Sequence, residues 1–341
     1  MAALLPLEMG HAKGEKNKEL VILTWSDYLD PEVLQEFETS KGVTIRQVSF
    51  DSDQARDQLV VRKGSDAFDI MVVNSINLPV YARQNWLTPI DTSKIANSTH
   101  LESRWLADAE YSGKLFGIPY FWGNIGLGYR EDLVATPPTG WLDFFRPAEG
   151  LHGRLNAMAT NRELFGIALK ALGYSVNSEK PEELEEAEKL LLQQKAHVKS
   201  YIYLDINKES PLVTGEIAMA MLYNGDALKL QEFNNKTNYI NPKEGSAMWV
   251  DYLALGTGSA RRELAMAFLN FMQDPTIAMR NAQSLHFATP NREALRLSSP
   301  AYRNNPIIFP PEEVLRLSET IRPVAARTQR RINDVVARLL R

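Results

Sequence analysis

Acidic and aromatic side chains stand close together at three places in the sequence, a combination suited to binding a cation. The three stretches are W-S-D-Y at residues 25–28, Y-N-G-D at residues 223–226 and W-V-D at residues 249–251. A carboxylate forms charge-assisted hydrogen bonds with an ammonium group, and the face of an aromatic ring attracts a positive charge. The same residue types also serve folds, because a tryptophan at a strand end commonly fills a core and an aspartate commonly precedes a helix.

Two of these aspartates have a specific structural alternative. Asp27 could cap the helix that is expected to start near Pro31, although Asp30 is better placed for that role. Asp226 could cap a helix that begins at Ala227. The sequence leaves both alternatives open.

Catalytic and metal-binding patterns are missing from the sequence. It holds no G-x-S-x-G motif, no P-loop, and no G-x-G-x-x-G that follows a strand and opens a helix. Cysteine is absent, which excludes thiolate chemistry and disulfides, and the five histidines lack metal-ligand spacing. The chain is therefore expected not to be an enzyme and to use no cofactor or metal. Paired carboxylates such as Glu163 with Asp226 leave glycoside hydrolysis as a remote alternative.

The composition is that of a soluble globular protein, with 341 residues of which 44% are hydrophobic and 23% charged. This length allows two domains. The net charge of -4 removes the basic surface that nucleic acid requires, so nucleic acid is not an expected partner. No apolar run approaches the length that crosses a bilayer.

The first 18 residues are expected to be a signal remnant or a tail. Residues 1–12 are an apolar stretch that resembles the back half of a secretory signal and ends in G-H-A. The stretch lacks a basic segment and contains Glu8, so a frayed or cloning-derived tail is the other interpretation.

The elements that must position the acidic and aromatic residues begin with a βαβαβ pattern. Apolar runs at residues 20–23, 43–50 and 68–73 predict strands, and helical patterns follow Pro31 and Asp51. Such a unit forms a mostly parallel sheet that binds ligands beyond the carboxyl ends of its strands. Residues 25–28 and 74–77 follow two of these ends.

The rest of the chain predicts a second α/β unit. Residues 117–129 are apolar and glycine-rich, which indicates a buried strand at a domain boundary. Further strands are expected at residues 198–204, 217–222 and 248–255, and helices at residues 162–172, 181–194 and 262–272. No linker rich in proline, glycine or serine separates the two units, so interleaved domains are expected.

Eight segments resemble, in order and spacing, the periplasmic polyamine-binding proteins, the family that captures putrescine and spermidine. The resemblance runs from about residue 19 to about residue 291 and rests on TWSDYLDPEVLQEFETSKGV, DIMVVNS, GIPYFWGNIGLGY, NRELFGIALKALGY, AMLYNGDA, PKEGSAMWVDYLAL, LNFMQDPTIA and ATPN. It implies an α/β, type II periplasmic-binding protein fold, in which two α/β lobes with crossing segments close over a ligand cleft. Lobe 1 is expected at residues 19–124 and 250–295, and lobe 2 at residues 125–249 and 296–341.

The resemblance also implies a set of ligand-binding residues, taken from positions that match the family's ligand contacts. The set is Trp25, Ser26, Asp27, Tyr28, Ser75, Glu163, Tyr223, Asp226, Trp249, Asp251 and Phe287. A polyamine carries ammonium groups at methylene spacings, so the acids would bind its ends and the aromatic rings its apolar middle. Glu163 could also be only a first-turn helix acid, and Ser75 only a turn former.

Several of these positions carry residues that differ from the family's usual ones, and the differences bear on which polyamine is bound. Tyr223 replaces a usual tryptophan and Phe287 a usual tyrosine, while Thr160 stands where spermidine-type members tend to have an aspartate. An asparagine, Asn77, stands where those members have an aromatic residue. The Ser-Asp and Gly-Asp pairs of the putrescine-type members are retained, so the ligand class is better supported than the ligand.

The function implied by the resemblance is capture of a polyamine in the periplasm and its presentation to a membrane partner. Putrescine, spermidine and norspermidine are the expected ligands. The expected partner is the permease of an ABC transporter, and the alternative is a membrane signalling receptor, either a cyclic-di-GMP enzyme or a kinase. The chain is expected to be a monomer.

Overall fold

The computed structural model describes residues 19–158 and 160–341, so the apolar stretch at residues 1–12 lies outside the described residues. The chain begins with β1 (Glu19–Trp25), α1 (Pro31–Lys41), β2 (Thr44–Phe50), α2 (Asp53–Lys63) and β3 (Ile70–Asn74). β1 lies between β2 and β3 and pairs with both in parallel. The predicted βαβαβ unit is confirmed, and the carboxyl ends of its three strands meet at one edge of the sheet.

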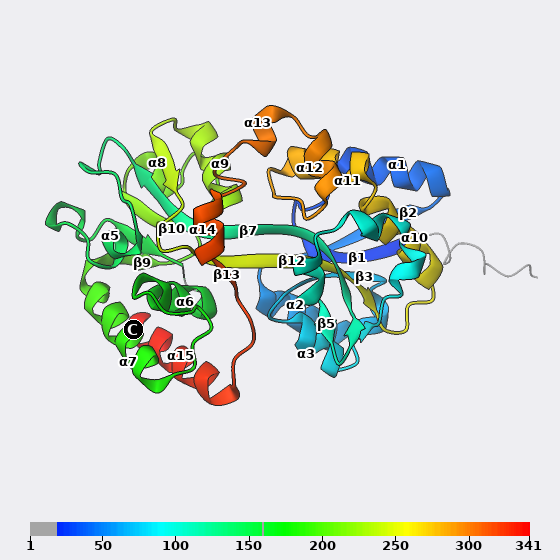
Figure 1. The fold of residues 1–341 in the computed structure, drawn as a ribbon, viewed down its shortest axis with the longest axis horizontal. Coiled ribbons are helices and arrows are strands. Elements are labelled where there is room, and N and C mark those ends of the chain that lie inside the picture. Colours follow the sequence, from blue (N-terminus) through cyan, green and yellow to red (C-terminus); the bar gives the residue numbers. More distant parts are fainter. Residues whose placement is uncertain (1–18, 159) are drawn as a thin grey trace, which may run out of the picture.

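Two long strands connect this unit to the rest of the protein. β7 (Gly117–Arg130) is buried along its whole length. Its first part, as far as Asn124, pairs with β12 (Ala247–Gly256), and from Ile125 onward it pairs with β10 (Met219–Tyr223). The sheet follows the order β2-β1-β3-β12-β7-β10-β8-β9, in which β8 is Leu155–Ala157 and β9 is Val198–Tyr201. β7 and β12 therefore run through the middle of the molecule, as Figure 1 shows.

Short elements precede and follow β7. Before it lie α3 (Leu78–Arg83), β4 (Leu87–Thr88), α4 (Ser103–Ala107), β5 (Glu110–Tyr111) and β6 (Lys114–Leu115). After it come α5 (Trp141–Phe145), β8 (Leu155–Ala157), α6 (Asn161–Ala171), α7 (Pro181–Gln194), β9 (Val198–Tyr201), α8 (Pro211–Thr214), α9 (Asn224–Phe233) and β11 (Thr237–Ile240). The strand expected at residues 198–204 ends at Tyr201, because its partner β8 ends at Ala157, which pairs with Tyr201.

The C-terminal elements return to both parts of the molecule. They are α10 (Arg262–Met272), α11 (Pro275–Leu285), α12 (Arg292–Leu297), α13 (Pro300–Arg303), α14 (Glu312–Leu317), β13 (Glu319–Thr320) and α15 (Ala326–Leu339). Helix α11 packs on α1 and α12, whereas α15 packs on α6 and α7. The chain thus crosses between the two parts more than once, as the missing linker led us to expect.

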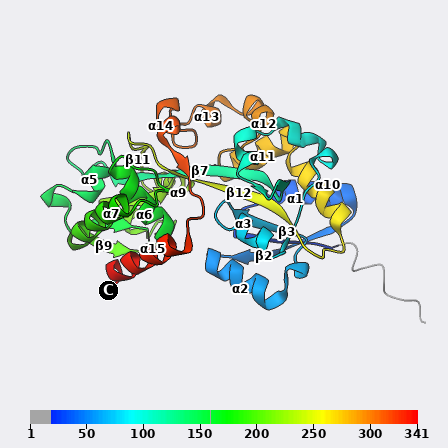
Figure 2. The same ribbon diagram turned by 60° about the horizontal axis from the view of Figure 1, so that its bottom comes forward.

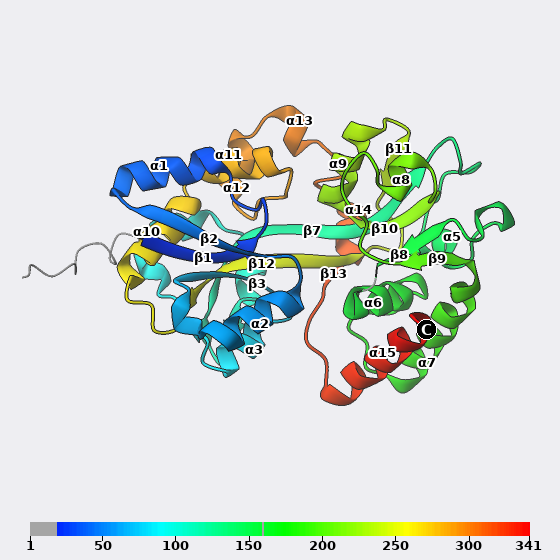
Figure 3. The same cartoon turned by 180° about the vertical axis from the view of Figure 1, so that it is seen from behind.

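Two large hydrophobic clusters divide the core. The first contains Leu23 and Val72, and the second contains Phe165 and Met221. We call the elements around the first cluster the first half and those around the second cluster the second half. β12 passes from one cluster to the other between Ala247 and Met248. Helices cover both faces of the sheet in each half, with α1 and α11 opposite α2 and α3 (Figures 1–3).

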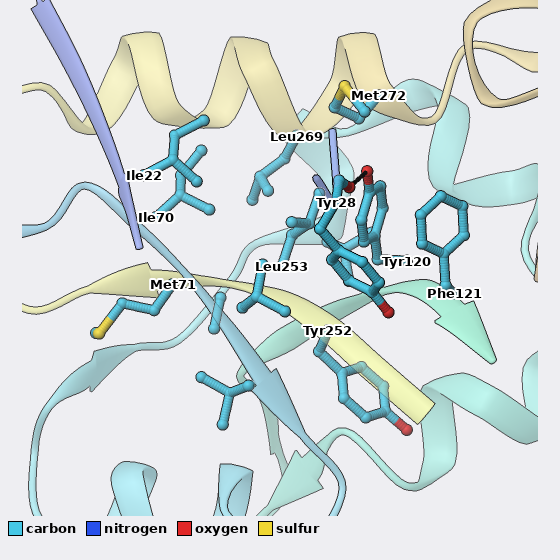
Figure 4. Packing of buried hydrophobic residues seen from close by; sticks show 14 of the residues in the cluster. Ile22, Tyr28, Ile70, Met71, Tyr120, Phe121, Tyr252, Leu253, Leu269 and Met272 are labelled. Atoms are coloured by element: carbon cyan, nitrogen blue, oxygen red, sulfur yellow. Dashed lines mark hydrogen bonds between the residues drawn. The ribbon is translucent and has the colours of Figure 1, made fainter. Parts of the chain in front are cut away.

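A buried polar network fixes the chain where it leaves β1. The Tyr120 hydroxyl donates to the carbonyl of Tyr28 at 2.8 Å and accepts from the Asn281 side-chain amide at 2.8 Å. The side-chain oxygen of Asn281 in turn accepts from the N–H of Asp30 at 3.0 Å. Figure 4 shows Tyr28 and Tyr120 side by side against the buried residues of the first half. The turn after β1 is therefore held by β7 and by α11.

Asp30 caps α1, as the sequence favoured. Its carboxylate accepts from the N–H groups of Glu32 at 2.8 Å and Val33 at 3.3 Å. Asp27 lies earlier in the turn, is exposed, and has a left-handed backbone with φ of 52°. The capping role considered for Asp27 therefore belongs to Asp30.

Replacing Asp30 with alanine should lower the free energy of unfolding by about 1 kcal/mol, because two first-turn N–H groups lose their acceptor. Urea unfolding followed by circular dichroism measures the change. Asp27→Asn is the control, since asparagine tolerates the left-handed backbone, and its effect should stay within about 0.5 kcal/mol. A loss from Asp27→Asn as large as that from Asp30→Ala would contradict this assignment.

Candidate functional site

The turn that follows β1 carries the first predicted stretch, and its residues have different surroundings. Trp25 ends the strand and packs its ring against Phe50, with ring centroids 4.5 Å apart. Ser26 and Asp27 are exposed, whereas Tyr28 is buried. The turn is needed because β1 must pass into α1, which Asp30 and the following proline start within a few residues.

Asp251 lies at the centre of the structure, on β12, and meets the first stretch. The Tyr28 hydroxyl donates to its Oδ2 at 2.8 Å, although 223 positions separate the two residues. Asp251 is only 6% exposed. Burial raises the pKa of its carboxyl to about 6, against the opposing effect of the Tyr28 hydroxyl.

Four of the predicted aromatic residues form one continuous series from different elements. Tyr28 contacts Phe287 with ring centroids 5.1 Å apart, and Phe287 contacts Trp249 at 5.7 Å. Trp249 contacts Tyr223 at 6.3 Å. Each contact is close to edge-to-face, with interplanar angles of 64°, 85° and 83° respectively. We call these four rings the aromatic series, and it runs from the first half to the second.

Glycines allow the close packing of this series. A Cβ atom on Gly225 would lie 2.7 Å from the Phe287 ring, and one on Gly123 would lie 2.6 Å from the Trp249 ring. Both distances are too short for any side chain larger than hydrogen. The glycine in the Y-N-G-D stretch therefore lets α9 approach Phe287.

The second half contributes two partly buried acids. Glu163 lies in the first turn of α6, and burial raises the pKa of its carboxyl. Asp226 lies in the first turn of α9, and burial raises its pKa to about 6. The helix begins at Asn224, so the capping role considered for Asp226 is wrong: its carboxylate accepts from the Tyr203 hydroxyl at 2.5 Å instead.

Tyr203 is a functional candidate that the sequence reading missed. Its ring lies 6.2 Å from that of Tyr223 and continues the aromatic series toward solvent, since 55% of the residue is exposed. The sequence pattern predicts that Tyr203 lies within a strand. In the structure β9 ends at Tyr201, so Tyr203 lies in the segment after the strand. Two more aromatic neighbours, Tyr120 and Phe121, pack against Tyr28 from β7.

The hydroxyl and the N–H group of Ser75 both donate hydrogen bonds within the protein. Its hydroxyl donates to the carbonyl of Ile321 at 3.0 Å, and its N–H donates to the carbonyl of Val250 at 3.0 Å. Ser75 is buried, and it ties β3 to the segment that follows β13. This contact supports a structural role, while the residue also lies beside β12 at the same edge as Asp251.

The six tryptophans separate by exposure. Trp105, Trp122 and Trp141 are buried, and the indole N–H of Trp141 donates to the carbonyl of Gly245 at 2.8 Å. Trp86 is partly buried and packs edge-on against Tyr81 at 4.9 Å. Trp25 and Trp249 are also partly exposed, and of the six only Trp249 belongs to the aromatic series.

The described residues contain neither a metal-binding cluster nor a membrane-spanning helix. Within residues 19–158 and 160–341, no group of three histidine, cysteine, aspartate or glutamate side chains is placed to hold a metal ion. In the same part of the chain, no helix combines the length and apolar character needed to cross a membrane.

Comparison with known proteins identifies the relatives of this chain. Residues 32–310 match the family described as bacterial extracellular solute-binding protein. The chain is 30% identical over 339 residues to the putrescine-binding periplasmic protein SpuD of Pseudomonas aeruginosa, with 94% of this chain and 91% of the relative covered. It is 30% identical over 305 residues to the norspermidine sensor of Vibrio cholerae, with 89% and 83% covered.

The fold has a close counterpart among crystal structures. The substrate-binding protein PotD of a spermidine/putrescine ABC transporter from Streptococcus pneumoniae superposes with a TM-score of 0.85 at 26% identity. The superposition covers 94% of this chain and 98% of that protein. The expected α/β, type II periplasmic-binding fold is thus confirmed.

Asp251→Asn should stabilise the protein without ligand by about 1–2 kcal/mol at pH 8. A pKa raised from 3.8 to about 6 means that ionised Asp251 costs the folded state about 3 kcal/mol, of which asparagine relieves a part while still accepting from Tyr28. The cost is present above pH 6 and disappears as the pH falls through 6 toward 3.8, so the advantage should vanish near pH 4. Thermal unfolding at both pH values measures it, and a variant less stable than the unmodified protein at pH 8 would contradict the argument.

Proposed function

The chain belongs to the bacterial extracellular solute-binding protein family, among its spermidine- and putrescine-binding members, and from this premise we propose that it captures a polyamine between its two halves. The family binds solutes and does not transform them, so the chain is not an enzyme. The resemblance seen in the sequence is confirmed. The proposal concerns the ligand, the residues that bind it and the partner that receives it.

The observation that carries the proposal is an aromatic series with carboxylates at both ends. At one end, Asp251 is hydrogen-bonded to Tyr28. At the other end, Asp226 is hydrogen-bonded to Tyr203, whose ring lies beside Tyr223. A polyamine has the same order of chemistry, with ammonium groups separated by methylene chains. Its charges would meet the acids and its methylene groups would lie along the rings.

The expected strength of such contacts is sufficient for a transport or sensing protein. Each cation–π contact contributes about 0.5–2 kcal/mol, and each charged hydrogen bond about 1.5–3 kcal/mol. A few of them together exceed the roughly 8 kcal/mol that corresponds to micromolar affinity. Water exclusion on closure of the halves would strengthen both kinds of contact.

The sequence suggested lobes at residues 19–124 with 250–295 and at residues 125–249 with 296–341, and we propose two lobes with these bounds except for the last crossing. The two hydrophobic clusters support this division, and β7 and β12 connect them. Tyr302 and Ile308 pack in the first cluster, so we place the last crossing after Ile308. The ligand would bind where these strands pass from one cluster to the other.

The proposed ligand-binding residues fall into three groups. The acids bind ammonium groups, the aromatic residues contact the methylene chain, and Ser26 and Ser75 supply polar contacts at the carboxyl edge of the sheet. The set is Trp25, Ser26, Asp27, Tyr28, Ser75, Glu163, Tyr223, Asp226, Trp249, Asp251 and Phe287, with Tyr203 added by the structure. Putrescine, norspermidine and spermidine are the candidate ligands, in keeping with the names of the relatives.

Delivery to a membrane partner completes the proposal. The PotD relative is named as the substrate-binding protein of an ABC transporter, which supports an ABC permease as the partner. The SpuD relative is named as a periplasmic protein, which supports the periplasm as the location. The Vibrio relative is named as a norspermidine sensor, which supports a membrane signalling receptor as the second candidate. We propose a monomer in either case.

Isothermal titration calorimetry with putrescine, norspermidine, spermidine and spermine tests the function. At least one of the first three should bind with micromolar or tighter affinity at pH 7.5. The affinity should fall by about tenfold for each of Asp226 and Asp251 between pH 7.5 and pH 5, because an ammonium group binds the ionised carboxylate and both pKa values lie at about 6. Absence of binding to all four amines would overturn the proposed function, and an affinity unchanged with pH would remove these two acids from the contacts.

Trp249→Ala should abolish measurable binding while the protein remains folded, because it removes the central ring of the aromatic series. Trp86→Ala is the matched control: it should lower the melting temperature by several degrees and leave the dissociation constant within about twofold. Calorimetry and thermal unfolding of both variants supply the comparison. Loss of binding by Trp86→Ala in a protein that melts normally would show that the two tryptophans are assigned to the wrong roles.

A further inference from the structure

Asp53, which the sequence reading did not select, lies at the same edge of the sheet as the proposed site. It opens α2 directly after the capping residue Ser52, close to the end of β2. The last residue of β2, Phe50, is the strand partner of Trp25. The Asp53 Oδ2 atom accepts from the side-chain amide of Asn74 at 2.9 Å, and Asn74 is the strand partner of Asp251. Asp53 therefore lies at the edge formed by three neighbouring strand ends, the same edge that carries Trp25 and Asp251.

A buried arginine, Arg56, forms an ion pair with the Asp53 carboxylate. Arg56 Nη1 lies 2.8 Å from Asp53 Oδ1, and the guanidinium is fully buried. Arg56 Nε donates to the Tyr81 hydroxyl at 3.0 Å, and the guanidinium lies over the rings of Phe50 and Tyr81 at 5.5 Å and 5.4 Å. A planar cation held on several sides restricts its acidic partner to one orientation. The Asp53 side chain remains 44% exposed, so part of the carboxylate is open to a ligand.

The negative charge of Asp53 affects the pKa values of acids in both halves. Burial is the main reason why the pKa values of Glu163 and Asp251 are raised, and the negative charge of Asp53 raises both further. Glu163 belongs to α6 in the second half, and α2 lies on the side of the first half that faces α6 (Figures 1 and 3). Asp53 is therefore near enough to Glu163 and Asp251 for their charges to interact, and a cation among these acids would relieve their repulsion.

Asp57 provides an internal comparison on the same helix. It also pairs with Arg56, at 3.6 Å, and its side chain is 45% exposed, almost the same as that of Asp53. It lies one helical turn farther from the edge of the sheet, and it accepts from the Tyr81 hydroxyl at 2.5 Å. The two acids therefore share a counter-ion and differ in whether they reach the edge.

We propose that Asp53 is a further ligand-recognition residue of the polyamine site, where its carboxylate binds one ammonium group from the side of the first half and Arg56 keeps it in place. This inference rests on the proposed function. The ammonium group lies between Asp53 of α2 and the acids of α6 and β12, so it contacts both halves when they close. Binding of an ammonium group by Asp53 thereby favours closure of the two halves.

The competing explanation is that Asp53 only balances the buried charge of Arg56 and stabilises the start of α2. In that case Asp53→Asn and Asp57→Asn should have the same effect on ligand affinity, because each removes one of the two negative charges beside the same guanidinium. If Asp53 binds ligand, only Asp53→Asn should weaken binding. The two variants are matched in chemistry, exposure and helix.

The experiment titrates the unmodified protein, Asp53→Asn and Asp57→Asn with putrescine, norspermidine and spermidine in a calorimeter at pH 7.5, and records the melting temperature of each variant. Asp53→Asn should raise the dissociation constant about 10- to 100-fold, the range for loss of one charged hydrogen bond, and Asp57→Asn should change it less than about twofold. Affinities within twofold for both variants, or equal losses in both, would overturn the role of Asp53. Failure of the unmodified protein to bind any of these three amines or spermine would overturn the proposed function, and this role with it.

A second variant keeps the test informative if Asp53→Asn does not fold. Asp53→Asn leaves Arg56 with one acidic partner, which can destabilise the protein because the guanidinium is buried. Asp53→Asn combined with Arg56→Gln removes both charges and keeps the local net charge unchanged. The same 10- to 100-fold loss is expected from this folded double variant, and an unchanged dissociation constant would overturn the proposal.

Discussion

The structure depends on the pairing of β7 with β12, because these strands are shared by both hydrophobic clusters. Gly123 of β7 is the strand partner of Trp249, and Ile125, two positions later, is the strand partner of Tyr223. One short piece of backbone therefore sets the distance between an aromatic residue of the first half and one of the second. A one-residue register change there would move Trp249 or Tyr223 to the opposite face of the sheet and interrupt the aromatic series, since neighbouring strand positions point to opposite faces.

The carboxylates of the site are held in surroundings that do not favour their charge. Burial raises the pKa of Asp226 and Asp251 to about 6, and their hydrogen-bond donors are tyrosine hydroxyls rather than cations. An acid that served only the fold would be more stable with an arginine or lysine beside it, as Asp132 is with Arg130. Under the proposed function, this arrangement lowers the stability of the protein without ligand and favours binding of a cation.

Much of the fold could be predicted from the sequence because its determinants are local. Apolar runs marked β1, β3 and β7, the Asp30-Pro31 pair marked the start of α1, and the absence of a linker indicated interleaved halves. Errors occurred where a partner strand decided the outcome. β9 ends at Tyr201 because β8 ends there, and no local pattern in residues 198–204 reports the length of a neighbouring strand.

For the site, the sequence by itself determined the chemistry: acids beside aromatic rings, no catalytic motif, and a family whose members bind polyamines. The tertiary structure alone decided which of these side chains meet. It joined Tyr28 to Asp251 across 223 positions, assigned Asp226 to Tyr203 instead of a helix cap, and brought Asp53 to the same edge with a buried arginine behind it. The physical reason is that composition and spacing specify which groups are available, whereas strand register and burial determine their distances and the environment of their charges.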